Sequence, residues 1–141
     1  MKNKKVLILG GTGFIGRNLV EFFLKKNFSV TATRFTSKKY NLPKLKWIKI
    51  DLRNFNQIKK KIKNFDIVIQ AAATTSGANI IINKPYHHVT DNAVMNSYLL
   101  RGIFQNKIDK FIFLSCSVMY PSRKIKQTEK DGQKPYEIID K

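Results

Sequence analysis

Near its start the chain reads Val6-Leu7-Ile8-Leu9-Gly10-Gly11-Thr12-Gly13-Phe14-Ile15-Gly16, and this stretch decides the fold. A short apolar run of branched residues comes first and predicts a buried strand. Glycines at a spacing of three follow, and they lead into the amphipathic pattern of a helix that extends to Lys26. The order of strand, glycine turn and helix is typical of a dinucleotide-binding unit.

Each glycine of the turn has its own physical reason. Gly10 is able to take the positive φ that a tight strand-to-helix turn often needs. Gly13 has no Cβ, so backbone is able to approach a pyrophosphate, and Gly16 lets the helix pack close to the strand. The free N–H groups and the positive end of the helix dipole then face the phosphates. The cofactor-binding residues predicted here are Gly10, Thr12, Gly13, Phe14, Ile15 and Gly16. The alternative is a glycine turn of an α/β fold that binds no ligand.

Composition bounds the class of protein. The 141 residues fit one domain, 43% are hydrophobic, and no apolar run approaches the length of a membrane span. Cys116 is the single cysteine, which suits a reducing cytoplasm. The net charge of +18 raises the alternative of a protein that binds nucleic acid or another polyanion. The basic residues are mostly lysines spread along the chain, however, and we interpret them as a bias of the overall composition. The positive electrostatic field that they create would attract an anionic cofactor or substrate.

Alternation of strand and helix patterns predicts an α/β fold. We expect a Rossmann-like, doubly wound parallel sheet of strand order 3-2-1-4-5, with a ligand cleft at the switch between strands 1 and 4. The expected strands are 5–9, 28–34, 46–51, 65–73 and 110–115, and the expected helices are 14–26, 55–63 and 85–106. Residues 74–79 are expected to be a loop, followed by the apolar patch 80–82. The first helix should bury Ile15, Leu19, Phe22 and Phe23, and the long helix a stripe of Val89, Ala93, Asn96, Leu100 and Ile103.

Strand ends supply the remaining cofactor contacts that the sequence predicts. Arg34 closes the second strand, where an acidic residue selects NAD and an arginine accommodates the 2′-phosphate of NADP. NADP is therefore the preferred cofactor and NAD the alternative, although Arg34 could also belong to a basic surface loop. Asp51-Leu52 closes the third strand and could meet the adenine, or Asp51 could cap the next helix. The small residues Ala71-Ala72-Ala73 leave room for a ligand beside the first strand.

The features that carry a resemblance occur in this order along the chain: the glycine signature, Asp51-Leu52, Ala71-Ala72-Ala73, Asn92 and the serine-rich segment before Tyr120. With these features in this order, the chain resembles the extended short-chain dehydrogenase/reductase family of nucleotide-sugar epimerases and dehydratases. Within that family, the segments from Ala71 to Asn92 and from Phe113 to Pro121 look most like the GDP-L-fucose synthase branch. The resemblance implies a nucleotide-sugar substrate and hydride transfer by a bound nicotinamide cofactor. It also implies an active site made of a Ser or Thr, an acid/base Tyr and a Lys.

The catalytic residues are only partly recognisable. Counting back from Tyr120, the Ser/Thr position falls on Cys116, and Ser115 and Ser117 flank it. One of these three is the candidate, although Cys116 could instead be a small buried side chain. Tyr136 is followed four residues later by Asp140 rather than Lys, so we interpret it as a loop residue. His87 and His88 are interpreted as surface histidines, and no metal site is predicted.

The expected organisation is an NAD(P)-binding domain over residues 1–121 and a polar loop or truncated segment over 122–141, with the substrate domain of the family absent. The first hypothesis is therefore the NAD(P)-binding portion of a nucleotide-sugar epimerase, dehydratase or reductase, inactive alone unless another chain supplies the Tyr and Lys. A partner chain or a homo-oligomer would fit this hypothesis. The alternatives are a standalone NADP-binding sensor module and a basic polyanion-binding protein on a Rossmann scaffold.

Overall fold

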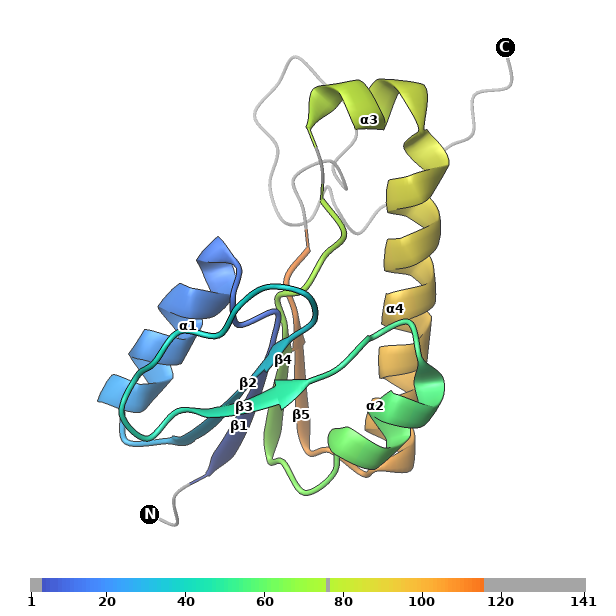
Figure 1. Ribbon diagram of the computed structural model, residues 1–141. Helices are drawn as coiled ribbons and strands as arrows, with labels where there is room; N and C mark the ends of the chain where they lie inside the picture. The colour runs from blue at the N-terminus through green and yellow to red at the C-terminus, as the bar shows by residue number, and fades with distance from the viewer. Residues whose placement is uncertain (1–3, 76, 116–141) are drawn as a thin grey trace, which may run out of the picture.

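A five-stranded parallel sheet forms the centre of the molecule (Figure 1). The structure is a computed structural model and describes residues 4–75 and 77–115. Every neighbouring pair of strands runs parallel, and the order β3-β2-β1-β4-β5 confirms the prediction. The strands are β1 (Lys5–Leu9), β2 (Ser29–Arg34), β3 (Lys46–Lys49), β4 (Ile67–Gln70) and β5 (Lys110–Phe113).

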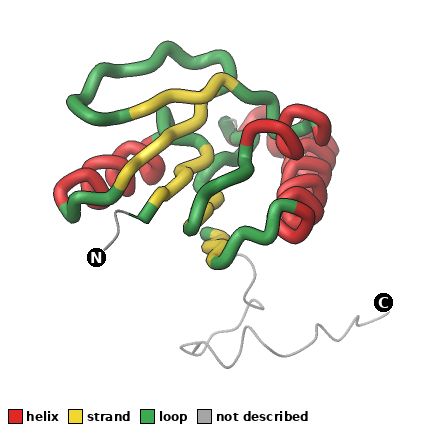
Figure 2. The backbone as a smooth tube through the Cα atoms, turned by 90° about the horizontal axis from the view of Figure 1, so that it is seen from below, coloured by secondary structure: helices red, strands yellow, loops and turns green. Residues whose placement is uncertain are grey.

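Helices cover both faces of this sheet, as Figures 1 and 2 show. They are α1 (Phe14–Lys25), α2 (Phe55–Lys61), α3 (Ala78–Asn83) and α4 (Pro85–Gln105). Side chains alternate along β1, so that Val6 and Ile8 pack with Val20 of α1, whereas Leu7 and Leu9 pack with α2 and α4. The result is a three-layer α/β/α arrangement in which the order of the strands changes direction between β1 and β4.

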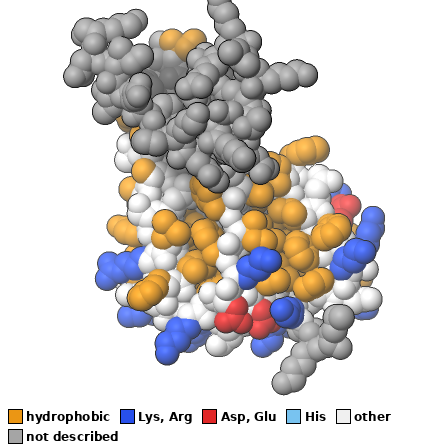
Figure 3. Space-filling view, turned by 180° about the vertical axis from the view of Figure 1, so that it is seen from behind, with side chains coloured by type: hydrophobic (Ala, Val, Ile, Leu, Met, Phe, Trp, Pro, Cys, Tyr) orange, Lys and Arg blue, Asp and Glu red, His pale blue; other side chains and the backbone are white. Residues whose placement is uncertain are grey.

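The helix faces predicted from the sequence are partly wrong. On α1 the buried residues are Gly16 and Val20, whereas Ile15 and Phe22 are each more than half exposed. The contacts of α1 are mainly with β2 and β1, so the helix buries the side that carries Gly16 and Val20. On α4 the buried residues are Met95, Leu99 and Gly102, whereas the predicted Val89 and Leu100 are exposed. Figure 3 shows apolar side chains gathered across one face of the molecule, with Lys and Arg around them.

Element ends agree with the sequence where a local side chain fixes them. Asn54 caps α2, because its side chain accepts a hydrogen bond from the N–H of Gln57. Asn27 follows the last turn of α1 with a φ of 60°. The segment after β4 differs from the prediction, since a short helix, α3, begins at Ala78 where a loop and an apolar patch were expected. In Figure 1, α3 and the first turns of α4 extend beyond the sheet at the end where the strands finish.

Candidate functional site: a pocket at the glycine turn

The glycine turn is held by hydrogen bonds to the end of β2. Gly10 has the predicted positive φ, 76°. Its N–H donates to Oγ1 of Thr33 over 3.0 Å, and the N–H of Gly11 donates to the carbonyl oxygen of Thr33 over 2.9 Å. The N–H of Gly13 donates back to the carbonyl oxygen of Gly10. Thr33 is buried, and the sequence did not single it out, because a threonine within a strand pattern carries no special signal.

Close packing explains why side chains are excluded from two of these glycines. A Cβ at Gly16 would lie 2.1 Å from the carbonyl oxygen of Gly10, and a Cβ at Gly10 would lie 2.6 Å from Cα of Ala72. Both contacts are with backbone, which has little freedom to move. Around Gly13, by contrast, a Cβ would meet only the carbonyl oxygen of Gly10, at 3.4 Å. The space beside Gly13 is therefore open on the side where a ligand would approach.

A pocket of about 750 Å³ opens beside this turn, at the carboxyl ends of β1, β2 and β4. Every cofactor-binding residue predicted from the sequence lines it except Gly16, which is buried behind the turn. These lining residues are Gly10, Thr12, Gly13, Phe14, Ile15, Arg34, Asp51, Leu52, Ala71, Ala72 and Ala73. The strand order thus brings together residues that lie up to 63 positions apart (from Gly10 to Ala73) at one edge of the sheet.

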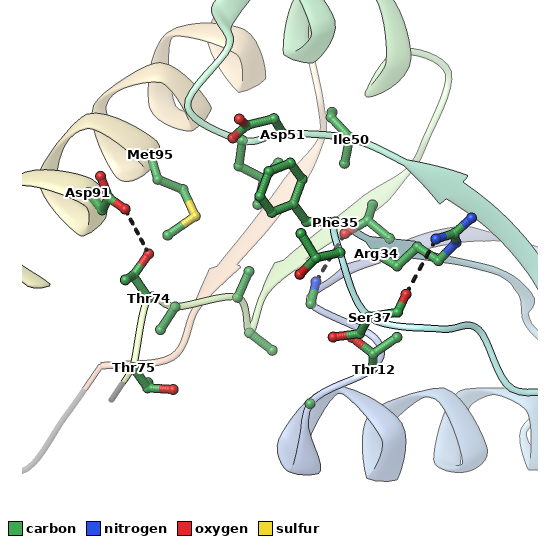
Figure 4. A pocket seen from close by; sticks show the side chains of 18 of the residues that line it. Thr12, Arg34, Phe35, Ser37, Ile50, Asp51, Thr74, Thr75, Asp91 and Met95 are labelled. Atoms are coloured by element: carbon green, nitrogen blue, oxygen red, sulfur yellow. Dashed lines mark hydrogen bonds between the residues drawn. The ribbon is translucent and has the colours of Figure 1, made fainter. Parts of the chain in front are cut away.

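The loop after β2 forms one wall of the pocket (Figure 4). Nη1 of Arg34 donates to the carbonyl oxygen of Ser37 over 3.3 Å, so the guanidinium lies against this loop. Ser37 lies near Thr12 in Figure 4, where the loop passes the start of α1. Phe35 also lines the pocket and is 45% exposed, which leaves its ring accessible to a ligand. The sequence had drawn attention to Arg34 but not to Phe35.

An arginine that sequence reasoning missed connects the loop after β3 to α4. The Nε and Nη2 of Arg53 donate to the two carboxylate oxygens of Asp51 over 3.1 and 3.2 Å, and its Nη1 donates to Asp91 over 2.9 Å. Hydrogen bonding from the Arg53 side chain holds the pKa of the Asp51 carboxyl below its usual range. Asp51 therefore stays ionised at neutral pH and keeps lone pairs for a donor in the pocket. It does not cap α2, because Asn54 does.

The segment after β4 is fixed by the amino-terminal half of α4. Asn92 accepts from the N–H of Thr74 over 2.9 Å and donates to the carbonyl oxygen of Thr74 over 3.0 Å, so its amide bonds both backbone groups of one residue. Nδ1 of His88 lies 3.0 Å from the same carbonyl oxygen. Oγ1 of Thr74 reaches Asp91. Thr74, Thr75, His87 and Asp91 line the pocket, and only the order of Asn92 in the family pattern hinted at this wall.

The candidate catalytic residues lie mostly outside the described residues. Ser115 follows β5 and is exposed, whereas Cys116, Ser117, Tyr120 and Tyr136 lie beyond the described part of the chain. The spacing of the family's tyrosine–lysine pair, with the lysine four positions after the tyrosine, occurs twice in the chain, at Tyr40–Lys44 and at Tyr120–Lys124. The prediction from the sequence includes neither pair. Tyr40 lies between β2 and β3, away from the pocket lining. In the sequence, Pro121 directly follows Tyr120 and so stands inside the Tyr120–Lys124 spacing.

Within residues 4–75 and 77–115 no group of three or more His, Cys, Asp or Glu side chains is arranged to hold a metal ion. No helix in the same part of the chain combines the length and apolarity that crossing a membrane requires.

Comparison with known proteins places these observations in a family. The model of the NAD dependent epimerase/dehydratase family matches residues 6–139. GDP-L-fucose synthase of Azorhizobium caulinodans is 32% identical over 123 residues, which are 86% of this chain and 36% of that protein. The chain thus spans about a third of the length of the curated relatives it matches.

Solved structures agree with the fold. The UDP-Glc/GlcNAc 4-epimerase of Campylobacter jejuni superposes with a TM-score of 0.81 and 25% identity, over 94% of this chain and 44% of that one. The Bordetella bronchiseptica enzyme WbmH, solved in complex with NAD+, has a TM-score of 0.72 and 20% identity over 87% of this chain and 43% of that one. With the family match over nearly its whole length, the chain belongs to the NAD dependent epimerase/dehydratase family.

Proposed function

We propose that this chain is the NAD(P)-binding portion of a nucleotide-sugar epimerase, dehydratase or reductase. The observation that carries the proposal is the pocket at the switch between β1 and β4, which gathers the glycine turn, the end of β2 and the end of β4. A cofactor of this class is elongated and anionic. A pocket with a helix amino terminus at its centre and strand ends on either side suits such a shape.

The turn is suited to phosphate because of the N–H groups it leaves available. The N–H groups of Gly10, Gly11 and Gly13 are used within the protein. Across the described residues, those of Thr12, Phe14 and Ile15 donate no hydrogen bond to the protein, and all three residues line the pocket. We infer that the cofactor phosphates accept from these groups and from the positive end of the α1 dipole.

The two ends of the pocket suit the two halves of the cofactor. Asp51, held ionised by Arg53, is placed to accept a hydrogen bond from the adenine amino group. Ala71, Ala72 and Ala73 leave space for the nicotinamide, with Thr74 and Thr75 as polar neighbours. When bound, the nicotinamide accepts or donates a hydride, and the protein groups listed here bind and orient it.

NADP is the cofactor that we propose this chain prefers. Arg34 lines the pocket at the end of β2, and Ser37 lies beside the same wall. A guanidinium there pairs with a 2′-phosphate, whereas a carboxylate would select the 2′-hydroxyl of NAD. Titration of the purified chain with NADPH and with NADH, followed by nicotinamide fluorescence, tests both proposals. We expect tighter binding of NADPH. Equal dissociation constants would overturn the preference, and no binding of either would overturn the function.

We further propose that the 141-residue chain does not transfer hydride by itself. Tyr136 has Asp140 rather than a lysine four residues on, and the Tyr120–Lys124 spacing contains Pro121 directly after the tyrosine. The purified chain, incubated with NADPH or NADP and a panel of GDP- and UDP-sugars, should bind cofactor but leave both the absorbance at 340 nm and the chromatographic composition of the sugars unchanged; the second readout is needed because epimerisation and dehydration regenerate the cofactor. Turnover of any of these sugars would refute this point while leaving cofactor binding intact.

A further inference from the structure

Tyr40 contacts the glycine turn from outside the pocket. Its hydroxyl donates to the carbonyl oxygen of Gly11 over 3.1 Å. Neither Tyr40 nor Gly11 lines the pocket, whereas Thr12, the next residue, does. Tyr40 thus contacts a residue of the turn that is 29 positions away in the sequence, and it does so without lining the pocket.

The geometry of a trans peptide gives this contact a consequence. In the Gly11–Thr12 peptide the carbonyl and the N–H are held in one plane and point in opposite directions. The Tyr40 hydroxyl fixes the carbonyl oxygen on the outer side of the turn. The N–H of Thr12 is thereby directed away from Tyr40, and Thr12 itself borders the pocket. No acceptor in the described residues takes a hydrogen bond from that N–H.

Three further contacts fix the position of the Tyr40 side chain and backbone. The guanidinium of Arg17 lies over its ring, with Cζ 4.9 Å from the centroid. The ring of Trp47 meets it edge to face at 5.0 Å, and the indole N–H donates to the carbonyl oxygen of Tyr40 over 3.1 Å. Burial raises the pKa of the Tyr40 hydroxyl, so it remains a protonated donor at neutral pH.

We propose that Tyr40 is a positioning residue for cofactor binding: by holding the Gly11 carbonyl outward, it aims the Thr12 N–H at an anionic oxygen of the cofactor. The proposal rests on the proposed function, because it assumes that the pocket takes a phosphate-bearing ligand. Tyr40 lies outside the glycine signature, so the signature alone does not predict this role.

Tyr40→Phe is a clean test, because it removes the hydroxyl and keeps the ring that contacts Arg17 and Trp47. Binding of NADPH, ADP and adenosine should be compared in the parent chain and the variant. We expect the dissociation constants for NADPH and ADP to rise about three- to tenfold, as loss of one aimed hydrogen bond predicts. Binding of adenosine, which has no phosphate, should change less than twofold, whereas general loosening of the pocket would weaken all three ligands.

Tyr98→Phe is the matched control. Tyr98 is a partly buried tyrosine of α4 that packs on the core and lies outside the pocket lining, so its variant should bind all three ligands as the parent does. A second measurement needs no ligand. The ¹³C shift of the Gly11 carbonyl reports the hydrogen bond that it accepts, and it should move in Tyr40→Phe but not in Tyr98→Phe.

The outcomes separate the two proposals. If the parent chain binds no NADPH, the proposed function fails, and the cofactor role of Tyr40 fails with it even where the carbonyl shift moves. If the parent binds NADPH and Tyr40→Phe binds it equally well, only the role of Tyr40 is overturned. Equal weakening of adenosine and ADP also overturns it, because the effect would then not pass through a phosphate.

Discussion

Nη1 of Arg53 lies 2.9 Å from Oδ2 of Asp91, and this ion pair joins the loop after β3 to α4 beside the pocket. The same guanidinium pairs with Asp51 at 3.1 Å and lies over the ring of Phe35, with Cζ 5.3 Å from the centroid. One side chain therefore connects the ends of two strands with a helix. Because all of these groups are partly exposed, the value of the arrangement lies in fixing the wall of the pocket more than in net stability.

The Arg53–Asp51 pair predicts an acid-dependent contribution to stability. The folded-state pKa of Asp51 is lowered, first of all by the side-chain hydrogen bond from Arg53. A lowered carboxyl pKa contributes stability that is present above the unfolded value near 4 and is lost as the pH falls through the folded value. Arg53→Gln should therefore be less stable than the parent at pH 7, by about 1 kcal/mol or less, with a gap that closes in acid.

Urea denaturation of both proteins between pH 7 and pH 3 measures this gap. Arg101→Gln is the control, since Arg101 lies over the ring of Phe55 without a carboxylate partner among the described residues. The difference between that variant and the parent should not depend on pH in the acid range. A gap for Arg53→Gln that is as large at pH 3 as at pH 7 would contradict the assignment.

Gly16 should tolerate no side chain. A Cβ there would lie 2.1 Å from the carbonyl oxygen of Gly10 and 2.9 Å from Cα of Gly11, both in the backbone of the turn. Gly16→Ala should lower the free energy of unfolding by about 3 kcal/mol or more, because α1 must shift away from β1. Gly77→Ala is the control, as a Cβ at Gly77 meets nothing within 4 Å, and it should cost about 1 kcal/mol or less. Thermal unfolding monitored by circular dichroism compares them, and similar melting temperatures for the two variants would refute the packing argument.

The sequence predicted the sheet well because its signals are local. The apolar runs that became β1 and β4, the cap at Asn54 and the positive φ of Gly10 each depend on a few neighbouring residues. Parallel pairing and right-handed connections then leave few possible strand orders. The predicted strand around 65–73 was too long, because the small residues Ala71 to Ala73 continue the apolar pattern after the ladder ends at Gln70.

The walls of the pocket could not be predicted in the same way. Arg53 and Asp91 are 38 residues apart, and Thr74 and Asn92 are 18 apart, so no spacing rule connects them. The helix faces were misassigned for a related reason. Ile15 and Phe22 are apolar and correctly spaced, yet α1 contacts mainly β1 and β2, and which side of a helix is covered depends on the neighbouring strands.

Gly102 and Ile58 should be energetically coupled. A Cβ at Gly102 would lie 2.5 Å from Cγ2 of Ile58, so the glycine lets α2 and α4 approach each other. Alanine is favoured over glycine in a helix interior by about 1 kcal/mol, but the clash opposes this gain. We expect Gly102→Ala to destabilise the parent chain and to stabilise an Ile58→Ala chain by up to about 1 kcal/mol. A double-mutant cycle by urea denaturation measures the coupling, and additive effects of the two substitutions would rule it out.

Arg34 provides the last prediction, which concerns the choice of cofactor. Its guanidinium lines the pocket and lies against the loop through the carbonyl oxygen of Ser37, so it is placed to meet a 2′-phosphate with little loss of side-chain freedom. Hydrogen bonds between charged groups are worth about 1.5–3 kcal/mol, so Arg34→Gln should weaken NADPH binding at least about tenfold. NADH, which lacks the 2′-phosphate, should bind within about twofold of the parent value.

The net charge of +18 offers a competing explanation, in which any lost cation weakens an anionic ligand. Lys59→Gln separates the two, since it removes one positive charge from the exposed side of α2, away from the pocket lining. If Arg34 contacts the 2′-phosphate directly, Lys59→Gln should leave the ratio of NADPH to NADH affinity unchanged. Arg34→Gln should remove the preference for NADPH. If both variants lower NADPH affinity to the same extent, and the effect disappears at high salt, the preference reflects the general field of the protein and Arg34 makes no specific contact.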